Sequence, residues 1–232
     1  MTREEGDRAG AAQLTLELPH DVALGAEDFF ISGSNEHAYG LIEAWPDWPK
    51  RALVLSGPPG SGKTHLASIW QGRSGARTIA SNDLIADIVP QLAGHSAIVI
   101  EDGPGAALDE TALFHLLNLV GERDLALLIT TTAYPAAWTV ALPDLASRLR
   151  ALPVVELNAP DEPLLRAVLV KLFADRQLAI DETVIAYMVA RMERSIAAAR
   201  RLVDLVDRAA LAEQVSITRP FVARIMRDRG LV

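Results

Sequence analysis

The sequence contains no cysteine among its 232 residues. Disulfide bonds, thiolate metal sites and cysteine nucleophiles are therefore excluded, and a reducing, cytoplasmic setting is expected. No apolar run approaches the roughly 20 residues that cross a bilayer. The first residues, 1–12, are polar and lack the apolar stretch of a signal peptide. We therefore expect neither a membrane protein nor an exported one.

Positive charge is also scarce, because 22 Lys and Arg face 30 Asp and Glu, which leaves a net charge of −8. The deficit lies in residues 1–159, where 10 basic residues meet 20 acidic ones, whereas residues 160–232 carry 12 basic and 10 acidic residues. An acidic body repels the phosphate backbone of nucleic acids. We thus expect no strong autonomous DNA binding, and any contact with nucleic acid would come from the C-terminal part.

Half of the residues are hydrophobic, which is enough for a core domain and a small appended one. Five nearly continuous apolar runs of strand length alternate with helical stretches, a pattern typical of parallel strands covered on both faces. This alternation predicts a doubly wound α/β core with a five-stranded parallel sheet. The expected strands are Ala52–Ser56, Thr78–Ala80, Ala97–Ile100, Leu125–Thr130 and Val154–Leu157. The expected helices are 34–45, Lys63–Gln71, Asn82–Leu92, Thr111–Glu122 and Asp144–Arg150.

The pattern changes near residue 159, after which the periodicity is helical throughout. Breaks at Asp181, Arg194 and Thr218 divide this part into four expected helices. We therefore expect a flexible tail at 1–23, an α/β core at 24–159 and a small all-α domain at 160–232.

Residues 57–64 follow the G-x-x-x-x-G-K-[ST] pattern of a phosphate-binding P-loop. The segment follows an expected strand and opens an expected helix, which is the context that this loop requires. Backbone N–H groups would surround phosphate oxygens, Lys63 would reach the β- and γ-phosphates, and Thr64 would bind Mg²⁺. The expected nucleotide-binding residues of the loop are Gly57, Pro58, Pro59, Gly60, Ser61, Gly62, Lys63 and Thr64.

Three further segments carry polar groups close to expected strands. The apolar run Ile98–Ile100 leads into Glu101 and Asp102, as in a Walker B site, where one carboxylate orients Mg²⁺ and the other polarises the attacking water. The run Thr130–Thr132 would lie beside the γ-phosphate, or it simply reflects the strand propensity of threonine. Arg148, on a short helix, could act as an arginine finger on a neighbouring subunit, or it is an ordinary surface arginine.

The order of these segments resembles the DnaA-like AAA+ ATPases, a family that includes the bacterial initiator DnaA and its regulatory relative Hda. The resemblance covers about residues 24–230 and implies an AAA+ core followed by a helical lid domain. It also implies ATP or ADP with Mg²⁺ as ligands, with nucleotide contacts from Phe30, Ile31 and His65, and with Thr64 and Glu101 at the metal. The segments that carry it are FFISGSN (29–35), GPPGSGKTHL (57–66), IED (100–102), FHLLN (114–118), LLITTTAYP (127–135) and LPDLASRLR (142–150).

A short peptide, QLTLELP at 13–19, stands in place of the large N-terminal region of DnaA, as in Hda and its alphaproteobacterial form, HdaA. In that family such a peptide docks on the DNA polymerase sliding clamp. An extended chain would present its glutamine and spaced leucines to apolar pockets, and an ordinary edge strand is the alternative. The matching residues are Gln13, Leu14, Leu16 and Leu18. Since the sequence ends at Val232, we expect no helix-turn-helix domain of the initiator type.

The resemblance implies a regulator that binds the clamp and DnaA and promotes hydrolysis of DnaA-bound ATP by inserting Arg148. A trans-acting arginine is worth ~10³–10⁵ in rate. Three positions depart from DnaA: Glu101 replaces an aspartate, Thr132 an acid at sensor 1, and Ala197 the sensor-2 arginine. We therefore expect slow ATP hydrolysis by the chain itself. The arginines near that helical face are Arg194, Arg200 and Arg201.

Other readings share the same core. A helicase loader of the DnaC or IstB kind should carry a longer helicase-binding extension than the first residues provide. A non-catalytic adaptor would bind clamp and DnaA with nucleotide as a structural ligand only. A DNA-binding initiator conflicts with the acidic core. Association with further copies of the chain, the resting nucleotide and direct contact with DNA are left open.

Overall fold

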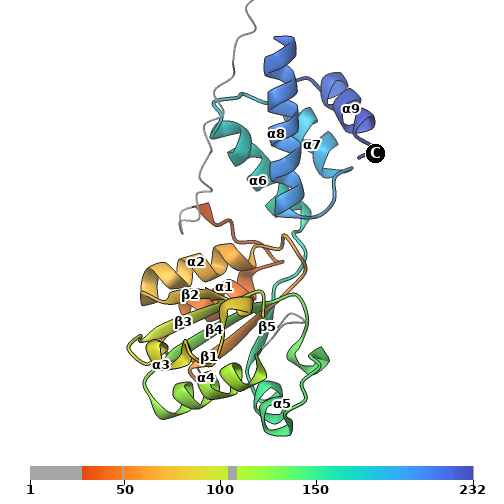
Figure 1. Cartoon of the computed structure of the whole chain (residues 1–232). Coiled ribbons are helices and arrows are strands. Elements are labelled where there is room, and N and C mark those ends of the chain that lie inside the picture. The colour runs from red at the N-terminus through yellow and green to blue at the C-terminus, as the bar shows by residue number, and fades with distance from the viewer. Residues whose placement is uncertain (1–27, 49, 104–108, 232) are drawn as a thin grey trace, which may run out of the picture.

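The computed structural model describes residues 28–48, 50–103 and 109–231. A five-stranded sheet forms the core in the lower half of Figure 1, with strands in the spatial order β2-β3-β4-β1-β5. Every neighbouring pair is parallel, which confirms the predicted α/β core with a five-stranded parallel sheet. The strands are β1 (Ala52–Ser56), β2 (Arg77–Ala80), β3 (Ala97–Glu101), β4 (Ala126–Thr131) and β5 (Val154–Glu156).

Helices cover both faces of this sheet (Figure 1). Along β1, Leu53 and Leu55 pack into the cluster formed with α1 and α2, while Ala52 and Val54 pack into the cluster formed with α3, α4 and α5. This burial on two faces explains why the strands are continuous apolar runs. The helices are α1 (Glu36–Glu43), α2 (Lys63–Ser74), α3 (Val89–Leu92), α4 (Glu110–Glu122) and α5 (Pro143–Arg150).

Four helices follow the sheet and form a separate hydrophobic cluster, which includes the fully buried Leu169, Met188 and Val203. They confirm the predicted helical C-terminal region and are called the lid below. A side-chain oxygen at each N-cap accepts a backbone hydrogen bond, which determines where each helix begins. The lid helices and their N-caps are α6 (Glu162–Ala174; Asp161), α7 (Glu182–Val189; Asp181), α8 (Ile196–Glu213; Ser195) and α9 (Arg219–Asp228; Thr218).

The predicted helix Asn82–Leu92 is wrong. The chain forms a 3-10 turn at Ser81–Asp83 and an extended residue at Leu84, and only the single turn α3 is α-helical. Pro90 has no N–H to bond the carbonyl of Ala86, so a helix cannot run through it, although proline is tolerated in the first turn of α3. None of the helices in the three described ranges is long and apolar enough to span a membrane.

Candidate nucleotide-binding site

The P-loop joins β1 to α2 and adopts a shape that needs glycine at three positions. Gly60 and Gly62 have φ angles of 72° and 105°, which side chains rarely tolerate. A Cβ on Gly57 would lie 2.3 Å from the carbonyl oxygen of Leu157, on the segment that follows β5. The glycines thus allow a tight loop that the segment after β5 approaches closely.

Lys63 lies at the first position of α2 with 7% of its surface exposed. Its Nζ donates to the carbonyl oxygens of Gly57 at 2.7 Å and Pro58 at 2.9 Å, so the ammonium group is directed into the loop. Burial lowers the pKa of Lys63, and the negative charge of Asp102 acts in the opposite direction. Neutral carbonyls are weaker partners for an ammonium group than charged phosphate oxygens, which makes Lys63 suited to bind a phosphate.

Ser61, in the middle of the loop, supplies a second sign that the loop fits a polar ligand. The residue is 2% exposed, and its Oγ has no hydrogen-bond partner within the described part of the chain. Buried hydroxyl groups are normally paired. An oxygen-rich ligand in the loop would satisfy this donor.

Thr64 and Glu101, the two residues predicted to lie at the metal, are in contact. The Thr64 hydroxyl donates to the Glu101 carboxylate at the end of β3, although the two residues lie far apart in the sequence. Burial and the neighbouring charge of Asp102 raise the pKa of Glu101, and the Thr64 hydrogen bond opposes that shift. A hydroxyl and a carboxylate fit Mg²⁺, which takes oxygen ligands and few protein groups. The described residues contain no group of three or more His, Cys, Asp or Glu that could hold a metal alone, so phosphate oxygens would complete the coordination.

Thr130, near the end of β4, holds Asp102, the second predicted Walker B acid, a role that the sequence did not predict for this threonine. Its Oγ1 accepts the backbone N–H of Asp102 at 3.2 Å, and its carbonyl accepts that of Gly103 at 2.8 Å. Asp102 has a φ of 53°, and Thr130 is 1% exposed, so the turn is stabilised from inside the sheet. The threonine run was the available signal. Thr132, the predicted sensor-1 residue, is exposed just beyond the end of β4.

The first turn of α8 lies directly on the P-loop. The backbone N–H of Ile196 donates to the carbonyl oxygen of Gly60 at 2.9 Å. A Cβ on Gly60 would lie 2.2 Å from Ser195 Oγ and 3.5 Å from the Cβ of Ala197. The predicted sensor-2 position is therefore beside the loop but carries only a methyl group. Sequence reasoning missed Ser195, although a serine just before a periodic helix is an N-cap signal.

Arg200 is one turn further along α8 and is partly buried. Burial lowers its pKa, and the negative charge of Asp204 opposes the shift. A desolvated guanidinium group on this helix keeps Arg200 as a candidate for the role of the missing sensor-2 arginine.

Aromatic and aliphatic side chains border the P-loop helix. The Phe29 ring meets the His65 ring edge-on, with 5.2 Å between ring centroids. The next two residues, Phe30 and Ile31, are 36% and 55% exposed despite being apolar. The contacts of Phe30, Ile31 and His65 with a nucleotide stay predictions.

The segment that carries Phe30 is also bonded to the lid. Asn35 Nδ2 donates to the carbonyl oxygen of Phe30 at 2.8 Å. The Asp161 carboxylate, which caps α6, accepts the backbone N–H of Ser34 at 3.2 Å. Lys171 of α6 pairs with Asp28 at 2.8 Å. The core, this segment and the lid therefore meet around the P-loop.

Arg148, the predicted finger, lies away from this meeting point. It is exposed on α5, and its guanidinium carbon lies 5.1 Å from the centre of the Phe114 ring on α4. Figure 1 shows α5 beside α4, at the end of the molecule opposite the lid helices. Arg148 is thus on a free surface, and the structure does not bring it to the P-loop of the same chain. The predicted clamp-binding residues at 13–19 lie outside the described residues.

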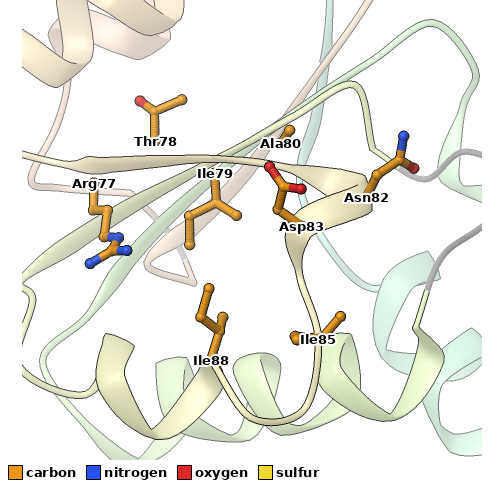
Figure 2. Close-up of a pocket in the computed structure, with 8 residues that line it drawn as sticks. All are labelled: Arg77, Thr78, Ile79, Ala80, Asn82, Asp83, Ile85 and Ile88. Atoms are coloured by element: carbon orange, nitrogen blue, oxygen red, sulfur yellow. The ribbon is translucent and has the colours of Figure 1, made fainter.

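An open hollow of about 560 Å³ lies along the edge strand β2. Figure 2 shows Ile79, Ile85 and Ile88 facing one another across it, with Arg77 and Asp83 at its rim. None of the P-loop residues lines it, so this hollow is not part of the candidate nucleotide site.

Comparison with known proteins is consistent with this geometry. Residues 163–226, most of the lid, match the family model described as Hda, lid domain. An uncharacterised protein of Haemophilus influenzae is 27% identical over 187 residues, which cover 75% of this chain and 80% of that protein. The chromosomal replication initiator protein DnaA of Clavibacter sepedonicus is 24% identical over 198 residues, which cover 74% of this chain and 41% of that protein. The chain therefore spans less than half the length of this DnaA protein.

Solved structures of DnaA share the fold. Domain III of the Thermotoga maritima replication initiation protein DnaA superposes with a TM-score of 0.75 at 19% identity, covering 91% of this chain and 98% of that domain. AMPPCP-bound DnaA from Aquifex aeolicus superposes with a TM-score of 0.69 at 16% identity, covering 90% of this chain and 70% of that one. These likenesses place the sheet and the lid together in the AAA+ fold of DnaA.

Proposed function

Because this chain is an Hda-type member of the DnaA-like AAA+ proteins, we propose that it regulates the initiation of chromosome replication by acting on DnaA. The match of its lid to the Hda lid domain carries this proposal, and that lid contacts the P-loop through Ile196 and Gly60. In this proposal residues 1–23 are a tail, 24–159 the nucleotide-binding core and 160–232 the lid.

We propose ATP or ADP with Mg²⁺ as the ligand of the P-loop. The similar DnaA of Aquifex aeolicus carries AMPPCP, an ATP analogue. Lys63 is positioned to bind phosphate, the Ser61 hydroxyl lacks a partner, and Thr64 and Glu101 offer adjacent oxygens. When bound, Mg²⁺ would neutralise phosphate charge, while these side chains hold and orient the nucleotide.

The nucleotide of this chain is proposed to support docking more than turnover. Ala197 places a methyl group where a cation would be needed beside the P-loop. Thr132 supplies no charge at the sensor-1 position. Without these groups the transition state for hydrolysis gains little electrostatic stabilisation. We expect the purified chain to hydrolyse ATP more slowly than about 1 per second, the lower end of ordinary enzyme rates.

Arg148 is the group proposed to act on the partner. Its exposed position on α5, opposite the lid, suits a head-to-tail contact in which one subunit's arginine reaches the next subunit's nucleotide. In the proposed complex that nucleotide is the ATP of DnaA. The tail peptide at 13–19 would attach the chain to the sliding clamp by β-strand-like docking of its leucines.

The test is a hydrolysis assay for DnaA-bound ATP in the presence of the clamp loaded on DNA, with and without this chain. We expect the chain to accelerate hydrolysis and a deletion of residues 1–19 to abolish the acceleration while nucleotide binding persists. Acceleration that survives the deletion would remove the clamp-docking role. No acceleration by the intact chain would contradict the regulatory function and favour a helicase-loader role instead.

A further inference from the structure

Two arginines flank one tyrosine on the surface where α7 meets α9. The guanidinium carbon of Arg191, just after α7, lies 4.1 Å from the centre of the Tyr187 ring, and that of Arg219, at the start of α9, lies 5.4 Å from it. Both arginines are exposed, and Tyr187 is half-buried. We call these three residues the Tyr187 surface. The ring thus attracts two like charges to one exposed site.

No carboxylate of the described residues forms an ion pair at this surface. Neither Arg191 nor Arg219 forms an ion pair with any residue in the part of the chain that the structure describes. Many acids of the lid pair with other cations or cap helices. Examples are the ion pairs of Arg166 with Glu162 and Glu182, Arg176 with Asp204 and Asp207, Arg201 with Glu193, and Arg224 with Glu213. The lid's excess of positive charge is therefore left at positions that include this surface.

We infer that the Tyr187 surface binds the phosphate backbone of duplex DNA. Guanidinium groups bind phosphate oxygens in a two-pronged geometry, and a tyrosine between them can contact sugar and phosphate. A duplex presents phosphates in a regular row, which suits two fixed cations better than it suits a single one. Figure 1 shows α7 and α9 together in the lid, apart from the sheet of the acidic core.

The contact is small and therefore weak, since two arginines neutralise about two phosphates. It becomes effective when the chain is tethered, because a second site on the same assembly raises the local concentration to about the millimolar range. The strengthening by a tether rests on the proposed function, in which the chain is held at a clamp that encircles DNA. The binding itself does not depend on that function.

The experiment is an NMR titration of the isotope-labelled full chain with a short mixed-sequence DNA duplex at low salt, because NMR detects weak complexes. We expect amide shifts around Tyr187, Arg191 and Arg219 that decline steeply as salt rises. In the R191A/R219A variant the negative slope of log affinity against log salt should become shallower by about 1.8, because each lost phosphate contact removes about 0.9. The control is Arg227→Ala, which removes an exposed arginine from the other end of α9 and should leave the slope nearly unchanged.

Three results would overturn the inference. The first is the absence of shifts at this surface with the intact chain at low salt. The second is an equal loss of affinity in R227A, which would indicate diffuse charge attraction. The third is a polyglutamate probe that shifts the same amides as strongly as the duplex, which would indicate an acidic protein partner. None of these measurements involves DnaA or the clamp, so failure here is distinguishable from failure of the proposed function.

Discussion

The backbone N–H of Ile196, in the first turn of the lid helix α8, donates to the carbonyl oxygen of Gly60 in the P-loop at 2.9 Å. Residues more than a hundred positions apart in the sequence thus share one hydrogen bond at the phosphate-binding loop. Ser195 caps the same helix and is 3% exposed, so the contact is well enclosed. The position of the lid and the conformation of the loop are therefore coupled.

Replacement of Gly60 by alanine should damage both stability and nucleotide binding. The φ of 72° disfavours a side chain, and the new Cβ would lie 2.2 Å from Ser195 Oγ. We expect a loss of about 1–2 kcal/mol from the backbone strain alone, with weaker ADP binding. Urea unfolding and titration with a fluorescent ADP analogue measure the two effects. The control is Gly72→Ala within α2, where a Cβ meets nothing within 4 Å; it should gain about 0.5–1 kcal/mol. Unchanged ADP affinity in G60A would contradict the coupling.

Thr130→Val should weaken the Mg²⁺-dependent part of nucleotide binding. The substitution keeps the shape of a side chain that is 1% exposed but removes the oxygen that accepts the Asp102 N–H. Loss of one such hydrogen bond costs about 1 kcal/mol, and Asp102 should then leave its left-handed conformation more easily. Nucleotide titrations with Mg²⁺ and with a chelator separate this effect from general damage. Thr78→Val on the exposed edge strand is the control, and equal Mg²⁺ dependence in both variants would speak against a positioning role for Thr130.

Arg148→Ala should abolish the stimulation of DnaA without altering the nucleotide affinity of this chain. The side chain is exposed on α5 and contacts Phe114 rather than the P-loop. Loss of an arginine finger reduces the stimulated rate by ~10³–10⁵. Arg150→Ala removes an exposed arginine from the same last turn and should retain stimulation. If R148A stimulates as well as R150A does, the chain acts as an adaptor with a structural nucleotide.

Asp161→Ala should destabilise the junction between core and lid. Its carboxylate accepts the N–H of Leu164 at 2.9 Å as the cap of α6 and that of Ser34 at 3.2 Å. Loss of an N-cap costs about 0.5–2 kcal/mol. Because Asp161→Ala also removes the bond to Ser34, we expect a cost at the upper end of this range. The measurement is urea unfolding, and a cost no larger than that of removing a simple cap would contradict the bridging role.

Asp181→Ala removes a simple cap, that of α7, and so serves as the comparison for Asp161→Ala. Its effect on stability should also depend on pH. Hydrogen bonds from Thr183 lower the pKa of Asp181 below its usual 3.8. The folded state therefore binds this proton more weakly than the unfolded state does, so the stabilisation is present above pH 3.8 and is lost as pH falls through the lowered pKa. The stability difference between wild type and D181A should shrink over that range, and a difference that is constant with pH would contradict the assignment.

The strands and the lid helices were predictable because their signals are local. Each strand is an apolar run of the right length, and the lid helices begin at or next to the predicted breaks, with Ser195 one residue after the break at Arg194. The prediction of a helix at Asn82–Leu92 was wrong because helical periodicity alone does not account for tertiary burial or for proline. Leu84 is pulled into the core at 1% exposure, and Pro90 prevents a continuous helix.

The sequence by itself determined the P-loop, the acids after β3 and the kind of fold, because glycines with forced backbone angles and buried apolar runs constrain the chain within a few residues. Only the tertiary structure decided which of these groups meet. It joins Thr64 to Glu101, Thr130 to Asp102 and Gly60 to the start of the lid. These contacts depend on the order of parallel strands and on the docking of the lid, which arise from the packing of segments far apart in the chain.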